Sequence, residues 1–305
     1  MRLLITGGSG MLGSYVATQA AEAGWETWAA YSNHAVELPG CHMLQLDIRD
    51  GTEVNRAIEK IGPEVIIHTA ALVKPDVCEQ RKSDASAVNT LGAVNIIAAA
   101  EKVGAHLVHI STDLVFSGER NPCRTDDPVC PVNHYGLTKA AAETAVRSSS
   151  LNWAIVRTSI IYGPRKFAFL ESFSDKVIET LRSGETMSAF TDQRRCPIPA
   201  WNLADVLLEI ADRRLTGIYH AVCQEPSTRY EFARKVAEVF GLDASLIKPI
   251  AMDEVQTLAL RPKTLILDTT STQAVLNTHL LSFEQGILEL RNRQDAALAS
   301  WRLKR

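Results

Sequence analysis

The residues best suited to chemistry are a tyrosine and a lysine four positions apart, in the segment Tyr135-Gly136-Leu137-Thr138-Lys139. On a helix this spacing places both side chains on one face. An ammonium group beside a phenol stabilises the phenolate and lowers the tyrosine pKa, so Tyr135 could protonate an oxyanion as a general acid. The spacing alone favours the ordinary alternative, a Tyr–Lys pair on the surface of a helix.

A hydroxyl group upstream in the sequence favours a catalytic role for this pair over an ordinary surface position. Thr112 stands in Ser111-Thr112-Asp113, directly after the apolar stretch Leu107–Ile110, which we predict to be a strand. The carboxyl ends of parallel strands are where open α/β folds bind ligands. Thr112 could therefore hold the same carbonyl oxygen that Tyr135 would protonate, and this context favours a catalytic role for the pair.

A glycine-rich turn near the N-terminus predicts a dinucleotide site. Thr6-Gly7-Gly8-Ser9-Gly10-Met11-Leu12-Gly13 follows the apolar stretch Leu3-Leu4-Ile5 and opens a helix-like segment. Strand, glycine turn and helix form the context that a dinucleotide fingerprint requires. Gly7 can take the tight turn, Gly10 lets the backbone approach a pyrophosphate, and Gly13 lets the helix pack close to the strand.

Strands and helices alternate through the first half of the chain, which predicts an α/β fold with a doubly wound parallel sheet of Rossmann type. The predicted strands are Leu3–Thr6, Glu26–Tyr31, Met43–Leu46, Val65–His68, Leu107–Ser111 and Ala154–Arg157. The predicted helices include Glu53–Ile61, Ala85–Val103 and Gly136–Ser148.

The regular alternation of strands and helices ends after Tyr162-Gly163-Pro164, where we expect a smaller substrate lobe to begin. It would begin with an amphipathic helix, Phe169–Ser183, followed by a polar loop, Asp192–Pro199. We predict that residues 1–165, together with about 198–224, form the dinucleotide-binding domain. Residues 166–305 would mainly form the C-terminal substrate lobe.

Composition excludes several classes of function. The 305 residues are 46% hydrophobic and 22% charged, with a net charge of −3. Without a basic block, neither nucleic acid nor an anionic membrane is expected as a partner. No apolar run approaches the ~20 residues of a membrane span, and the strand-like N-terminus does not resemble a signal peptide. Six scattered cysteines without a CxxC pair favour idle thiols in a reducing cytoplasm.

The histidines give no sign of a metal site. No HExxH spacing occurs, so we expect no metal and predict that the histidines in or beside strands are satisfied structural residues. These are His68, His106, His109 and His220.

Taken together, these motifs resemble the extended short-chain dehydrogenase/reductases, and more narrowly the dTDP-4-dehydrorhamnose reductase branch. The resemblance covers nearly the whole chain. Its supporting segments are Leu46-Asp47-Ile48, His68-Thr69-Ala70-Ala71, Ser111-Thr112-Asp113-Leu114-Val115-Phe116-Ser117-Gly118, Asn133-His134-Tyr135-Gly136-Leu137-Thr138-Lys139, Arg157-Thr158-Ser159-Ile160-Ile161-Tyr162-Gly163, Asp192-Gln193 and Arg261-Pro262.

The resemblance implies a role for each matching position. Thr112, Tyr135 and Lys139 would do the chemistry, and Tyr135 and Lys139 would also contact the cofactor. The remaining cofactor-binding residues would be Gly7, Gly10, Met11, Leu12, Ser32, Asp47, Ile48, Ala70, Ala71 and Leu72. The nucleotide-sugar substrate would be bordered by Val115, Phe116, Asn133, Gln193 and Arg261. The guanidinium of Arg261 matches a diphosphate in its fork geometry.

The sequence departs from the family pattern at three places, so the resemblance does not identify which sugar or which nucleotide the substrate contains. Thr69 stands where the family has an alanine, and the segment Lys74-Pro75-Asp76-Val77-Cys78-Glu79 differs from the commoner pattern. Arg194 and Arg195 follow Asp192-Gln193 where smaller residues are usual. These two arginines are either additional phosphate ligands or part of a solvated loop.

The end of the second strand indicates which cofactor is used. NAD-selective sites usually carry an acidic residue there, whereas this chain has Ala30-Tyr31-Ser32-Asn33-His34. A 2′-phosphate would not be repelled, and Ser32 or its neighbours could donate hydrogen bonds to it. We expect NADPH to be favoured, with NADH still usable.

The sequence therefore predicts a cytoplasmic NAD(P)H-dependent enzyme that reduces a keto group on a nucleotide-linked deoxysugar. Two alternatives stay open: a sugar-nucleotide epimerase or dehydratase on the same scaffold, and a non-catalytic NADP-binding regulatory subunit. Leu114 after Asp113 counts against a dehydratase, which would want a pair of carboxylates there. A homodimer also stays open, since no motif sets the oligomeric state.

Overall fold

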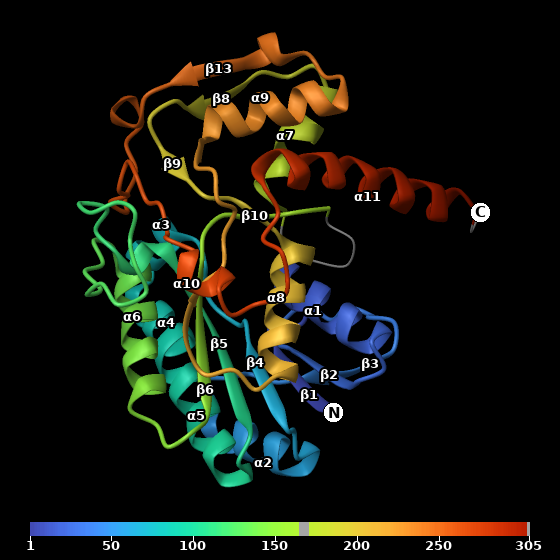
Figure 1. Ribbon diagram of the computed structural model, residues 1–305, viewed down its shortest axis with the longest axis vertical. Coiled ribbons are helices and arrows are strands. Elements are labelled where there is room, and N and C mark those ends of the chain that lie inside the picture. The colour runs from blue at the N-terminus through green and yellow to red at the C-terminus, as the bar shows by residue number, and fades with distance from the viewer. Residues whose placement is uncertain (165–170, 304–305) are drawn as a thin grey trace.

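A parallel sheet of seven strands forms the centre of the larger lobe (Figure 1). The computed structural model describes residues 1–164 and 171–303, with side chains as far as residue 294. The strand order is β11-β6-β5-β4-β1-β2-β3, which confirms the predicted doubly wound fold. The strands are β1 (Arg2–Thr6), β2 (Glu26–Tyr31), β3 (Cys41–Gln45), β4 (Val65–His68), β5 (His106–Thr112), β6 (Trp153–Thr158) and β11 (Gly217–His220).

The order of the strands reverses between β1 and β4, and ligands bind at such a reversal in open α/β sheets. The Gly-rich turn follows β1, and Thr69 follows β4. Both segments therefore lie at the carboxyl edge where a dinucleotide is expected.

Helices cover both faces of the sheet. On one face α1 (Met11–Glu22) packs against α8 (Ala200–Asp212), and the other face is covered by α2 (Gly51–Ile61), α5 (Gly92–Val103) and α6 (His134–Arg147). Alternate strand residues enter the two cores: Leu3 and Ile5 pack on the α1 side, while Leu4 packs on the α2 side. Burial on both faces explains why these strands are apolar throughout.

The predicted helix Ala85–Val103 is interrupted in the structure. The chain forms α3 (Pro75–Gln80), α4 (Lys82–Ser86) and a π-helical turn, Ala87–Leu91, before α5 begins. Alanine-rich periodicity does not reveal a π turn, because the turn depends on what its side chains bind elsewhere. Such turns occur often at functional sites.

The smaller lobe lies at the top of Figure 1. It contains α7 (Phe173–Arg182), the parallel pair β8 (Met187–Phe190) and β13 (Ile247–Ile250), and α9 (Arg229–Phe240). The long helix α11 (Phe283–Leu303) packs against α9. Helix α7 begins later than the predicted Phe169–Ser183 because Ser172 and Asp175 form a capping box at its start; Phe169 lies outside the described residues.

The segment Asp192–Pro199, predicted as a loop, contains two short strands. β9 (Arg194–Arg195) pairs antiparallel with β12 (Ser227–Thr228), and β10 (Ile198–Pro199) pairs in parallel with β7 (Ile161–Tyr162). A short helix, α10 (Thr270–Gln273), lies near β11. The loop prediction was wrong because two-residue pairings carry no periodic signal.

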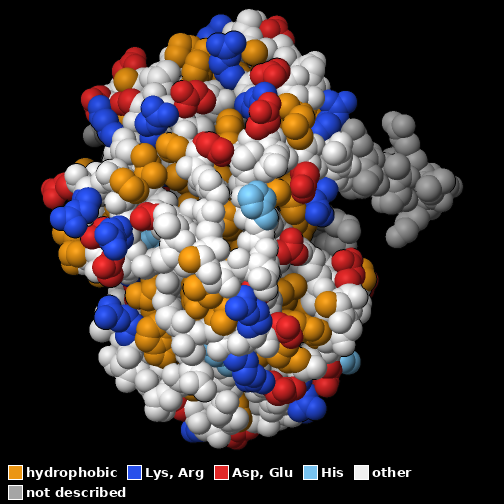
Figure 2. Space-filling view, viewed as in Figure 1, with side chains coloured by type: hydrophobic (Ala, Val, Ile, Leu, Met, Phe, Trp, Pro, Cys, Tyr) orange, Lys and Arg blue, Asp and Glu red, His pale blue; other side chains and the backbone are white. Residues whose placement is uncertain are grey.

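Charged side chains of both signs are interspersed over the face shown in Figure 2. Among the described helices, none combines the length and apolar character needed to cross a membrane.

Candidate active site

The Gly-rich turn has the geometry of a phosphate cradle. Gly7 has a φ of +74°, and a Cβ there would come within 2.8 Å of the Ala70 nitrogen. A Cβ on Gly13 would overlap the Gly7 carbonyl oxygen, so helix α1 can approach the turn only with glycine at that position. Gly10 provides no side-chain cap for α1, and the first turn of that helix holds no acidic residue. An uncapped helix N-terminus at this edge fits the pyrophosphate of a dinucleotide.

The predicted adenosine side of the site lies after β2 and β3. Ser32 is half-buried, and its backbone carbonyl accepts a hydrogen bond from Gln45. Asp47 forms an ion pair with Arg49 that lowers the pKa of the carboxyl group. Ile48 is buried, and Gly92 of α5 lies directly against it.

The loop after β4 is held in place by a residue that we did not predict. Asn89, in the π-helical turn, accepts a hydrogen bond from the Leu72 nitrogen at 2.7 Å and donates to the Leu72 carbonyl at 3.1 Å. Its amide also donates to Thr138 of α6. Asn89 therefore connects the predicted cofactor loop to the catalytic helix. Its only sequence signal is a polar residue inside an alanine-rich stretch.

The catalytic candidates Thr112 and Tyr135 meet at the end of β5. Thr112 is the last residue of this strand, and its hydroxyl accepts a hydrogen bond from the Leu114 nitrogen. Helix α6 begins at His134, earlier than predicted, because Asn133 caps it by accepting from the Gly136 nitrogen. Tyr135 thus lies in the first turn of α6, buried and within hydrogen-bonding reach of Thr112.

Lys139 lies one turn further along α6, and its Nζ is 3.2 Å from Nε2 of His109 on β5. Both side chains are buried. Burial lowers the pKa of Lys139 to about 8, although Glu143 opposes this shift. Tyr135, Lys139 and Glu143 therefore form one polar row along the inner face of α6.

A buried ion pair fixes the position of this row. Arg157 of β6 donates to both oxygens of Glu143, at 2.8 and 3.0 Å, and Ser111 donates to the same carboxylate at 2.5 Å. Both charged side chains are almost fully buried. Breaking one partner of such a pair is costly, because it leaves a buried charge without compensation.

The pKa of Tyr135 is raised in the structure, whereas the Tyr–Lys spacing had led us to expect a lowered pKa. Burial raises this pKa well above its ordinary value, the nearby Asp113 raises it further, and only the hydrogen bond to Thr112 lowers it. The Lys139 amine has its hydrogen bond with His109 instead. Desolvation of the phenol therefore outweighs the stabilisation expected from the Tyr–Lys spacing.

All five predicted substrate residues have their side chains engaged by other parts of the protein, and three of them are buried near the end of β5 and the start of α6. Val115 and Phe116 are buried in a small apolar cluster, and the Arg157 guanidinium lies 4.9 Å from the centre of the Phe116 ring. Asn133 is buried; besides capping α6, it donates to the Leu260 carbonyl. Asn133 thereby links the start of α6 to the segment that carries Arg261.

Gln193 and Arg261, the other two, lie in the smaller lobe's loops. Gln193 is buried and accepts a hydrogen bond from Nε of Arg229 at 3.3 Å. Arg261 forms a two-bonded ion pair with Asp76 of α3.

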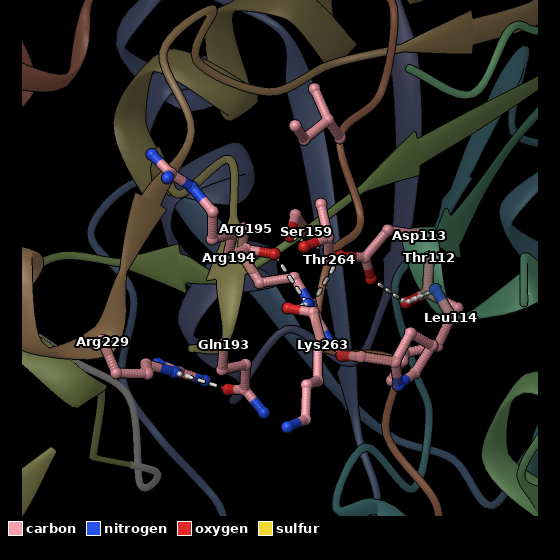
Figure 3. Close-up of polar contacts among 12 residues, drawn as sticks. Thr112, Asp113, Leu114, Ser159, Gln193, Arg194, Arg195, Arg229, Lys263 and Thr264 are labelled. Atoms are coloured by element: carbon pink, nitrogen blue, oxygen red, sulfur yellow. Dashed lines mark hydrogen bonds and ion pairs between the residues drawn. The ribbon is translucent and has the colours of Figure 1, made fainter. Parts of the chain in front are cut away.

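The two arginines after Gln193 behave differently from each other (Figure 3). Arg194 is exposed, whereas Arg195 is buried and donates to the backbone carbonyls of Pro262 and Lys263. Nε of Arg195 also lies 3.6 Å from Asp113, which accepts a hydrogen bond from Ser159. Arg195 thus fixes the loop that follows Arg261, which neither of the two alternatives for this pair anticipated.

Arg229, at the start of α9, is a further residue that sequence reasoning missed. Its guanidinium stacks 4.5 Å from the centre of the Phe173 ring, and Figure 3 shows it reaching towards Gln193. Burial and the nearby positive charges of Arg195 and Arg261 lower its pKa to about 10. No motif marks this position, because its importance depends on residues from two other segments.

Two of the four histidines predicted to be satisfied lie beside Lys139, and neither is fully hydrogen-bonded. Within the described residues, Nε2 of His68 and Nδ1 of His109 are buried without a hydrogen-bond partner, and so are both nitrogens of His106. The prediction that they are satisfied was wrong for these three. His220 does bond to the Asp268 carbonyl. No group of three or more side chains in the described part of the chain could hold a metal ion.

Comparisons with known proteins show the family to which the chain belongs. The chain matches the family model of the RmlD substrate binding domain over residues 1–295. It is 31% identical over 292 residues to the probable low-salt glycan biosynthesis reductase Agl14 of Haloferax volcanii, covering 95% of this chain and 97% of that protein. It is 32% identical over 295 residues to the methionine adenosyltransferase 2 subunit beta of Mus musculus, covering 94% and 86%.

The fold is shared with solved structures. The crystal structure of dTDP-4-dehydrorhamnose reductase from Bacillus anthracis in complex with NADP matches with a TM-score of 0.86 and 27% identity, covering 96% of this chain and 99% of that one. Family model, relatives and structure span nearly the whole chain. The protein therefore belongs to the RmlD substrate binding domain family, the dTDP-4-dehydrorhamnose reductase-like branch of the extended short-chain dehydrogenase/reductases, and is an NAD(P)-dependent oxidoreductase.

Proposed function

We propose that the protein uses NADPH to reduce a keto group on a nucleotide-linked deoxysugar. The observation that carries this proposal is the meeting of Thr112 and Tyr135 at the carboxyl end of β5, with Lys139 one helical turn away. These groups lie at the same edge of the sheet as the Gly-rich turn, so a bound nicotinamide and a carbonyl could meet there.

Each of the three catalytic candidates would have a separate role in the reduction. When bound, the cofactor supplies a hydride to the carbonyl carbon. Tyr135 donates its phenolic proton to the carbonyl oxygen as negative charge develops there. The raised pKa of Tyr135 keeps the phenol protonated at neutral pH, as an acid requires. Thr112 would hold the same oxygen, and the Lys139 amine would donate to the ribose of the cofactor.

The cofactor residues are proposed on local geometry. Gly7 and Gly10, with the backbone of Met11 and Leu12, would hold the pyrophosphate at the uncapped start of α1. Asp47 and Ile48 would flank the adenine, while Ala70, Ala71 and Leu72 would line the path to the nicotinamide. The two hydrogen bonds between the Asn89 side chain and the Leu72 backbone would hold this path in position.

A preference for NADPH rests on the residues after β2. Ser32, Asn33 and His34 follow the strand, and none of them carries a carboxylate that would repel a 2′-phosphate. Their side chains could donate hydrogen bonds to that phosphate. NADH would still bind, because no arginine among these residues makes a 2′-phosphate necessary.

The charges of the smaller lobe support an anionic substrate. Arg195 already interacts with Asp113, and Arg261 interacts with Asp76. Arg229 has a neutral partner, Gln193, and an aromatic ring beside it. A half-buried guanidinium whose only hydrogen-bond partner in the described residues is neutral favours an anionic partner. We therefore propose that Arg229 and Gln193, together with Arg261, contact the diphosphate of the substrate.

A regulatory role is the second candidate, because the chain is also similar to methionine adenosyltransferase 2 subunit beta of mouse. The presence of threonine, tyrosine and lysine at the catalytic positions favours the reductase. A dehydratase is less well supported, because Leu114 follows Asp113 where a second carboxylate would be needed, whereas a sugar-nucleotide epimerase on this scaffold stays an alternative.

The discriminating experiment measures NADPH absorbance during incubation with a panel of 4-keto sugar nucleotides. Steady oxidation with one of them, absent in the Tyr135→Phe variant, would support the reductase. Binding of NADPH without turnover on any member of the panel would favour the regulatory role.

A further inference from the structure

A row of buried polar side chains crosses three neighbouring strands below the catalytic helix. Thr6 of β1 is paired in register with His68 of β4, and His68 is paired with His109 of β5. The Thr6 hydroxyl lies 2.6 Å from Nδ1 of His68, and the two imidazole rings are 5.2 Å apart. The row ends at Lys139 of α6, beside His109.

The geometry fixes which atom donates in the last contact. A lysine ammonium has only donors, so the charged Lys139 must donate to Nε2 of His109 across their 3.2 Å separation. The imidazole proton then resides on Nδ1. Burial, with the nearby positive charge of Lys139, holds the pKa of His109 well below its ordinary value, so the ring is neutral and able to accept.

We propose that His109 is a positioning residue that holds the Lys139 amine through Nε2 and keeps it charged and directed at the cofactor ribose. This inference rests on the proposed function, since it concerns how Lys139 acts in that reaction. The two remaining ammonium hydrogens are then free to donate to the ribose hydroxyl groups.

Other ionisable groups also act on Lys139 or on its neighbour Tyr135. On α6 itself, Glu143 favours the charged amine. From β4, His68 is neutral, because burial and Lys139 lower its pKa to about 3. Asp113, after β5, and Cys78 of α3 both act on Tyr135. His109 therefore provides the direct hydrogen bond, while Glu143 contributes through its charge.

The chain contains a matched control for this contact. His106 begins the same strand, is equally buried, and has both ring nitrogens without a partner in the described structure. Because it lies three residues from His109, it faces the opposite side of the sheet. A general effect of losing a buried histidine from β5 would appear at both positions, whereas the proposed effect would appear only at His109.

The experiment compares His109→Phe, which keeps a ring but loses the acceptor, with His109→Gln, which keeps an acceptor, and with His106→Phe. An NMR pH titration of the Lys139 side chain, carbon-13 labelled at Cε, in the cofactor-free protein measures the pKa of its amine, with the resonance assigned by comparison with the Lys139→Met variant. Fluorescence titration measures NADPH affinity at each pH. Neither readout needs a sugar nucleotide, so both remain informative if the proposed substrate is wrong.

In His109→Phe we expect the pKa of Lys139 to fall by about one pH unit and the NADPH Kd to rise roughly tenfold near neutral pH, because a hydrogen bond to a charged group is lost. His109→Gln should largely restore both values, and His106→Phe should change neither. An unchanged Lys139 pKa in a folded His109→Phe variant would overturn the proposal. A His109→Gln variant that behaves like His109→Phe would do the same. If His109→Phe does not fold, His109→Leu provides a second variant without the acceptor.

Discussion

Arg261 and Asp76 form an ion pair through two hydrogen bonds, although they lie 185 residues apart in the sequence. Nη2 of Arg261 is 2.7 Å from Oδ2 of Asp76, and Nη1 is 3.1 Å from Oδ1. Asp76 also accepts a hydrogen bond from the Ala259 nitrogen. The guanidinium holds the pKa of Asp76 below its ordinary value. This pair ties the loop before Pro262 to helix α3, so the guanidinium proposed to meet the substrate diphosphate already has an anionic partner.

The first prediction separates direct substrate binding by Arg261 from support of the loop. Arg261→Ala should raise the KM for a sugar nucleotide about tenfold and lower kcat much less, because an interaction with the bound substrate is lost. Asp76→Asn should leave KM unchanged or lower it, since the guanidinium no longer has a competing carboxylate. Steady-state kinetics measures both. If Asp76→Asn raises KM as much as Arg261→Ala does, the ion pair acts by holding the loop, and direct binding by Arg261 is wrong.

A second prediction concerns Arg229. Arg229→Ala should raise the KM for the sugar nucleotide at least as much as Arg261→Ala does, because this guanidinium has no carboxylate partner among the described residues. NADPH affinity should stay nearly unchanged. Arg194→Ala is the matched control, an exposed arginine that follows Gln193 at the start of β9. Equal effects of the Arg229 and Arg194 substitutions would contradict a specific anion site.

A third prediction concerns the proton donor. Tyr135→Phe removes the phenolic hydroxyl while keeping the ring, so the protein should fold and bind NADPH. Loss of a general acid typically lowers the rate ~10²–10⁴-fold. Circular dichroism checks the fold, and single-turnover kinetics measures the chemical step. Wild-type turnover by a folded variant would remove Tyr135 from the mechanism.

The fourth prediction concerns cofactor choice. The wild-type protein should use NADPH at least as well as NADH, because no carboxylate follows β2. Ser32→Asp should repel the 2′-phosphate and shift the kcat/KM ratio towards NADH. Ser32→Asn adds bulk without charge and serves as the control. A strong NADH preference in the unmodified protein would contradict the interpretation, as would an unchanged ratio in Ser32→Asp.

The sequence was sufficient for those parts of the site that lie within one element or at one sheet edge. Tyr135 and Lys139 share a helix face, and Thr112 ends a strand at the expected edge, because periodicity and fold class determine both placements. The family resemblance is likewise confirmed by the match over residues 1–295.

Contacts between distant segments could not be predicted in this way. Asp76 meets Arg261 across the two lobes, and Arg229 meets Gln193 within the smaller lobe, so both contacts depend on tertiary packing. The contact between His109 and Lys139 was missed for the same reason, because it depends on how α6 packs against β5 of the sheet. The direction of the Tyr135 pKa also depended on burial, which residue spacing does not report.

The last prediction concerns Lys139 and stability. Burial lowers the pKa of its amine from the ordinary 10.5 to about 8, so between these two pH values the unfolded chain binds more protons than the folded protein. The contribution of this group to the free energy of unfolding therefore rises with pH across that window. Lys139→Met removes the group and should be most stabilising relative to wild type below pH 8. That advantage should shrink by roughly 3 kcal/mol as the pH approaches 10.5, at about 1.4 kcal/mol for each pH unit. Urea denaturation at a series of pH values measures this difference, with Lys60→Met, at an exposed position of α2, as the control. A stability difference between Lys139→Met and wild type that stays constant with pH would show that the buried amine keeps its ordinary pKa.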